Sequence, residues 1–221
     1  MFKKFVGVVA GMALIAGVTS TANAAPYMPV GPQNDVLKST VLSGGWSVCF
    51  SEPYGTVGTS ISSILAGCSG TSLMMAGAAV GSSTFDVLAQ ALFGDVAFAT
   101  GDGSSATHVA NGTQWYLGAN SSWGFAGLTD IVYRVSCDAE DVFNSPPTER
   151  DRLCWHTGGG ALDGGWRSGD NIWLNGSQDF ERFLLVSNNA VGQPELPAPG
   201  GLALLGLGLL GLGALRRKLS A

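Results

Sequence analysis

A histidine beside a glycine run is the clearest hint of catalysis in this sequence. His156 stands in LCWHTGGG, and the glycines after it could offer backbone N–H groups to a developing oxyanion. The serine motif GCSGT, at 67–71, lacks the last glycine of the G-x-S-x-G nucleophile elbow. The pattern therefore favours a hydrogen-bonding histidine at a strand end. A secreted hydrolase that uses His156 is the least favoured function.

Six tryptophans offer a second kind of chemistry, because flat indole rings can pack against sugar rings. Trp46, Trp155 and Trp173 lie in alternating apolar runs, which predicts that they belong to the core. Trp123 and Trp166 are each flanked by glycine, which makes them the candidate glycan contacts. A carbohydrate-binding module is therefore the alternative to a purely structural domain.

Four cysteines predict two disulfides in an oxidising compartment. Three pairings are open, and the pairing of near neighbours is Cys49–Cys68 with Cys137–Cys154. Each bond would contribute about 3 kcal/mol by restricting the unfolded chain. A zinc site is the rival, but no CxxC motif or Cys/His pair at ligand spacing supports it.

The charges argue against nucleic acid as a partner. Five of the 11 Lys and Arg residues lie at the two ends, whereas all 16 Asp and Glu lie between residues 35 and 195. The middle of the chain is therefore strongly acidic and has no basic surface for phosphates. Acidic turns at 101–104, 137–141 and 162–171 do not match a calcium-binding loop, so no cofactor is predicted, and calcium stays an open alternative.

The first 24 residues have the layout of a secretory signal peptide. Two lysines precede a 14-residue apolar stretch, Phe5–Val18, and Ala22-Asn23-Ala24 supplies an A-x-A cleavage site. As a helix this stretch would rise only about 21 Å, which is short for a membrane span. We therefore expect the Sec translocon and signal peptidase as partners, with cleavage after Ala24.

The C-terminal segment has three parts. Residues 194–199 read Pro-Glu-Leu-Pro-Ala-Pro, residues 200–215 contain only Leu, Gly and Ala, and a basic cluster follows. The apolar run predicts a single transmembrane helix, and the positive-inside rule leaves residues 216–221 in the cytoplasm. The basic cluster that would anchor this tail is Arg216, Arg217 and Lys218.

This layout resembles the PEP-CTERM sorting tail of Gram-negative bacteria, over residues 194–218. The resemblance implies recognition and cleavage by an exosortase during export to the cell surface or the exopolysaccharide matrix. The usual Val-Pro-Glu-Pro is replaced here by the sorting and processing motif Pro194, Glu195, Leu196, Pro197, Ala198 and Pro199. A plain tail anchor is the alternative. The spacing of W-Y, W-G-F, R-L-C-W-H-T and G-W-R further resembles an uncharacterised β-rich extracellular module.

The elements expected between the two ends are mostly strands. Residues 25–43 read as a Pro-spaced leader, 44–186 as one β-rich extracellular domain and 187–199 as a Pro-containing linker. One short helix is predicted at 59–68, and 85–99 is ambiguous between helix and strand. Alternating or apolar runs predict strands at 44–52 and 72–81 and in TQWYLG, SWGFAG, DIVYRVSC, RLCWHT, NIWLNG and RFLLVS.

The expected fold is therefore mainly β, as a β-sandwich or a compact α+β domain. The expected function is that of a non-catalytic, exported protein of the cell envelope or matrix. It would be held briefly in the inner membrane and would have the membrane, an exosortase and exopolysaccharide as partners.

Overall fold

β-Strands make up most of the regular structure in residues 25–103, 105–132 and 149–189, the part of the chain that the computed structural model describes. All of these residues belong to one compact unit, 24–195. Its strands are β1 (Gln33–Leu37), β2 (Ser47–Pro53), β3 (Val57–Ser60), β4 (Ser72–Ala79), β5 (Thr84–Leu92), β6 (His108–Ala110), β7 (Thr113–Leu117), β8 (Ser122–Gly127), β9 (Leu153–Gly158), β10 (Ala161–Asp163), β11 (Arg167–Ser168), β12 (Asn171–Ile172) and β13 (Phe180–Ser187).

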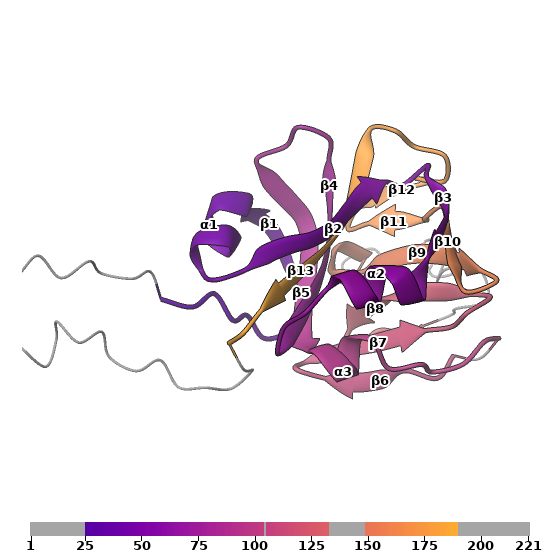
Figure 1. The fold of residues 1–221 in the computed structure, drawn as a ribbon, viewed down its shortest axis with the longest axis horizontal. Helices are drawn as coiled ribbons and strands as arrows, with labels where there is room; N and C mark the ends of the chain where they lie inside the picture. Colours follow the sequence, from indigo (N-terminus) through magenta and orange to yellow (C-terminus); the bar gives the residue numbers. More distant parts are fainter. Residues whose placement is uncertain (1–24, 104, 133–148, 190–221) are drawn as a thin grey trace, which may run out of the picture. The chain divides into compact units, whose positions relative to one another are not determined.

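The strands form two antiparallel sheets (Figure 1). The first has the order β1-β5-β4-β13-β2. The second has the order β12-β11-β9-β8-β7-β6, and β10 joins it by pairing with β9 and β3. The prediction of a mainly β domain is confirmed. The predicted strands at 44–52, 72–81 and in TQWYLG, SWGFAG, RLCWHT and RFLLVS are confirmed as well.

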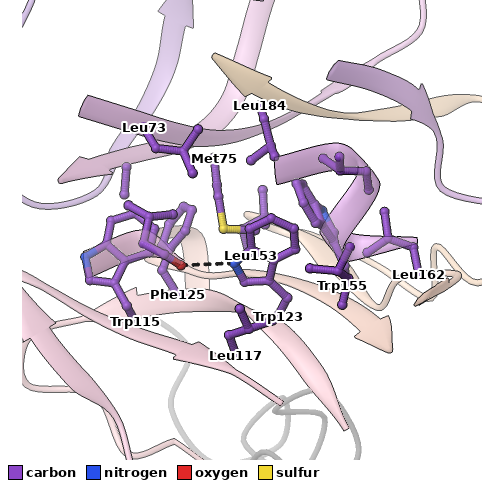
Figure 2. Packing of buried hydrophobic residues seen from close by; sticks show 14 of the residues in the cluster. Leu73, Met75, Trp115, Leu117, Trp123, Phe125, Leu153, Trp155, Leu162 and Leu184 are labelled. Carbon is purple, nitrogen blue, oxygen red and sulfur yellow. Dashed lines mark hydrogen bonds between the residues drawn. The ribbon is translucent and has the colours of Figure 1, made fainter. Parts of the chain in front are cut away.

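The main core lies between the two sheets. Leu73, Met75 and Leu184 from the first sheet face tryptophans and Phe125 from the second (Figure 2). Trp123 and Trp155 meet edge to face, with ring centroids 5.3 Å apart. The indole N–H of Trp123 donates to the carbonyl oxygen of Val96 at 3.2 Å. The indole ring of Trp123 is thus buried while its N–H group keeps a hydrogen-bond acceptor.

A second cluster covers the other face of the first sheet, and this explains the apolar run of β4. Leu73 and Met75 point into the main core, whereas Met74 and Ala76 pack into the second cluster with Trp46. Because successive strand residues point to opposite faces, a strand covered on both faces has no polar positions. The same alternation along β13 sends Leu184 to one cluster and Leu185 to the other.

The N-terminal segment supplies part of that cover, so the prediction of a leader at 25–43 is wrong. Residues Gln33–Leu37 form β1 and pair with β5, and Lys38–Ser43 form α1. Tyr27, Met28 and the fully buried Val41 pack in the second cluster. The prolines that suggested a leader precede the strand, where their missing N–H groups break no ladder hydrogen bond.

The helices are short. The predicted helix at 59–68 is confirmed as α2, Ile61–Gly67, whose Ser60 side chain caps it by accepting from the backbone N–H of Ser63. Two further helices, α1 and α3 (Phe93–Val96), also lie within the described residues, so the prediction of one helix was incomplete. The ambiguous stretch 85–99 divides into a strand, β5, followed by α3. A 3-10 turn at Glu149–Asp151 precedes β9.

One predicted disulfide joins Cys49 on β2 to Cys68 after α2, with Cα atoms 5.2 Å apart. Cys154 is also disulfide-bonded. Its predicted partner, Cys137, lies outside the described residues. In the pairing of β2 with β13, Val48 faces Leu185 and Phe50 faces Leu184, so Cys49 is the extra residue of a β-bulge. The disulfide therefore fixes α2 at the point where this edge strand is irregular.

No helix within the described residues is long and apolar enough to cross a bilayer. The predicted signal peptide at 1–24, the strand DIVYRVSC beyond residue 132 and the predicted transmembrane helix at 200–215 fall on residues that the structure does not describe.

Candidate functional site

A cleft of about 400 Å³ opens where the end of β9, the β2–β3 turn and the loop after β12 meet. Polar groups come from three of its residues, His156, Asp163 and Asn175. The Asn175 side-chain oxygen accepts from the backbone N–H of Gly165 at 3.1 Å, which fixes the amide in the wall. The lining consists of Gly55, Val57, His156, Asp163, Gly164, Asn175 and Gly176.

His156 is the titratable group that the cleft buries most. Burial lowers the pKa of its imidazole below 6.5, and the nearby Asp163 carboxylate opposes this shift. The ring is therefore neutral at pH 7. Its Nε2 atom is buried and has no hydrogen-bond partner. A hydrolase would need a serine hydroxyl hydrogen-bonded to this ring, and none of the described serines makes that contact.

Alternation along β9 explains why His156 lies in the cleft. Leu153 and Trp155 point into the core between the sheets, whereas Cys154 belongs to a small cluster on the outer face of the second sheet. His156, two residues after Cys154, points to the same outer face. The cleft is therefore a feature of that outer face.

Arg182, which sequence reasoning did not single out, holds two walls of the cleft together. This fully buried side chain on β13 donates to Gly164 O at 2.6 Å, to Thr56 O and to the Glu52 carboxylate at 2.6 Å. Glu52 lies directly opposite on β2 and also accepts from the Thr59 hydroxyl at 2.7 Å. Burial lowers the pKa of the Arg182 guanidinium, and Glu52 acts against this. A charge in the middle of an apolar strand was the signal available in the sequence.

The predicted glycan contacts are wrong. Trp123 has no exposed surface and lies between the sheets, and Trp166 is only 6% exposed. Conversely Trp173, predicted to be core, is 66% exposed, while Trp46 and Trp155 are buried as predicted. The two predicted surface rings therefore offer no platform for a sugar.

The glycines beside these rings explain the error. A side chain on Gly124 would overlap with the carbonyl oxygen of Leu153 on the neighbouring strand. One on Gly165 would overlap with the ring of Tyr54. These glycines permit close packing rather than an exposed turn.

A second polar pair lies away from the cleft. His108 on β6 and Asp95 on α3 are 2.7 Å apart, and both side chains are about one third exposed. The Phe98 ring stacks on the imidazole, with centroids 4.6 Å apart. This pair ties the edge strand β6 to α3, and its exposure is typical of a structural surface contact.

Several predicted sites fall on residues that the structure does not describe. These are the cleavage residues Ala22 and Ala24, the sorting motif 194–199 and the basic cluster at 216–218. No group of three or more metal-ligating side chains occurs within the described ranges.

The comparisons with known proteins gave no relative. No family model, no curated protein and no solved structure matches the chain.

Proposed function

We propose that the chain is an exported, non-catalytic protein of the Gram-negative cell surface or exopolysaccharide matrix. An N-terminal signal peptide would take it through the Sec translocon, and an exosortase would process its C-terminal tail. The observation that carries the proposal is the Cys49–Cys68 disulfide, because structural disulfides form and persist in oxidising compartments.

Two features of the fold support this proposal. The disulfide fixes β2, an edge strand of the first sheet, so it stabilises a part of the sheet that has a neighbour on only one side. The acidic middle of the chain keeps a protein of this kind soluble outside the membrane.

The test is to express the full chain in a Gram-negative host with and without an exosortase. We expect the mature protein to begin at Ala25 by mass spectrometry and to resist thiol alkylation until it is reduced. With the exosortase present, the tail beyond the 194–199 motif should be removed.

Two sets of variants separate the steps. Changing Pro197 and Pro199 to alanine should abolish the exosortase-dependent cleavage, whereas changing Val191 and Gln193 to alanine should leave it intact. Recovery of a cytosolic protein with Met1 in place and free thiols would refute the proposal.

A further inference from the structure

Trp173 is the only one of the six tryptophans that is exposed. Its side chain is 66% exposed, whereas the other five are at most 6% exposed. Burial of apolar area therefore accounts for the other five tryptophans and leaves Trp173 unexplained.

The backbone does not account for Trp173 either. Its φ of +65° lies in the left-handed region, where glycine and asparagine are favoured and a bulky side chain is strained. Strained residues of this kind gather at binding sites, where the surrounding structure holds them in place. Neither the core nor the turn requires an indole at this position.

The ring nevertheless packs against one buried neighbour, which orients it. It packs edge to face on Trp166, with ring centroids 4.2 Å apart and an angle of 66° between the planes. Trp166 belongs to the buried cluster on the outer face of the second sheet, with Tyr116, Val132 and Cys154. A preorganised aromatic ring loses little conformational freedom when it binds a ligand.

The sequence on both sides of Trp173 indicates which ligand would fit. Apart from Trp173, the exposed side chains of residues 163–179 are all polar, namely Asp163, Asp170, Asn175, Gln178 and Asp179. A stable protein interface needs about 800 Å² on each partner with an apolar centre, and one indole among polar groups does not provide that. A sugar ring has an apolar C–H face for an indole and hydroxyl groups for carboxylates and amides.

We propose that Trp173 is the stacking platform of a binding site for a neutral polysaccharide. The strongly acidic middle of the chain would repel an anionic polymer, so the ligand is uncharged. This inference goes beyond the proposed export, which determines only where the ligand would be met. Binding by the purified chain is measured independently of its localisation, so either proposal can fail alone.

The test is affinity gel electrophoresis of the purified full chain in non-denaturing detergent. The probes are a β-1,3-glucan, a β-1,4-glucan, a galactomannan and an α-glucan, with alginate as an anionic polymer. We expect at least one neutral polymer to retard the wild type and alginate to have no effect. Trp173→Asn should weaken the retardation at least tenfold, which corresponds to about 1.4 kcal/mol.

Three comparisons make the test specific. Trp173→Asn suits the left-handed backbone, so its thermal midpoint should match or exceed that of the wild type. Trp173→Phe keeps a flat ring and should retain part of the affinity. Phe98→Ala removes another aromatic side chain, 51% exposed, and should bind like the wild type.

Several results would overturn the proposal. These are no retardation of the wild type by any neutral polymer, retardation by alginate alone, or equal binding by wild type and Trp173→Asn. An unfolded Trp173→Asn variant would show that the ring is structural. Binding to phosphatidylethanolamine–phosphatidylglycerol vesicles that requires Trp173, without any binding to polysaccharide, would assign the ring to lipid.

Discussion

Replacing Arg182 with methionine tests how far one buried charge holds the two sheets together. The guanidinium has no exposed surface and donates to three acceptors, Glu52, Gly164 O and Thr56 O. Methionine has a similar length and fills most of the space, but it cannot donate. The substitution therefore removes the hydrogen bonds and leaves the shape of the core nearly intact.

The expected loss of stability follows from what remains behind. Breaking a buried ion pair by removing one partner costs about 3–5 kcal/mol, and each stranded carbonyl group costs about 1–3 kcal/mol. These costs overlap, since the Glu52 side chain is 12% exposed and can take up water. The added apolar contacts of methionine offset a further part. We expect the Arg182→Met variant to lose about 4 kcal/mol in its free energy of unfolding.

Urea unfolding followed by tryptophan fluorescence measures this change, because five of the six indoles are nearly or fully buried. Arg150→Met is the matched control. Arg150 pairs with Asp35 and Asp170, but its side chain is 47% exposed, so its loss should cost less than about 1 kcal/mol. Equal destabilisation by the two variants would refute the reasoning.

Three further predictions concern the disulfide, the cleft and the strand packing. Replacing Cys49 and Cys68 with serine removes a disulfide between residues 19 positions apart and should lower the free energy of unfolding by about 3 kcal/mol. Reduction of the wild-type protein should lower it as well. Because burial lowers the pKa of His156, the unfolded chain binds more protons than the folded chain, so the free energy of unfolding should fall as pH drops below 6.5. The thermal midpoint of His156→Gln should therefore depend less on pH between 7 and 5 than that of the wild type. Gly124→Ala should destabilise the domain by more than about 2 kcal/mol in urea, because its methyl group would overlap with the Leu153 carbonyl, and a wild-type midpoint would contradict this contact.

Much of the strand content could be predicted because the period-two pattern is a local property. In β8 and β9 large apolar side chains alternate with smaller or polar ones, and the large ones all pack in the main core, namely Trp123, Phe125, Leu153 and Trp155. The helix at α2 was predictable for the same reason, since Ser60 and the spaced apolar residues after it lie within three turns.

The candidate site was not predictable, because it depends on contacts between distant parts of the chain. A glycine next to Trp123 or Trp166 is compatible with two structures, an exposed turn or the close approach of another chain segment. Only the position of Leu153 and Tyr54 decides between them. The segment at 25–43 was misread because its apolar residues are few and their partner surface, the outer face of β4 and β5, lies far along the chain.

The order of the strands explains why such contacts dominate this fold. The last described strand, β13, lies between β4 and β2, so the first sheet is incomplete until the chain reaches residue 187. Arg182 then meets Glu52, 130 residues away in the sequence, whereas the Cys49–Cys68 link closes a short local loop. Loop closure over a long separation must be offset by strong native contacts. The buried, charge-assisted hydrogen bond between Arg182 and Glu52 supplies such a contact, and it forms only in the register in which these two residues face each other.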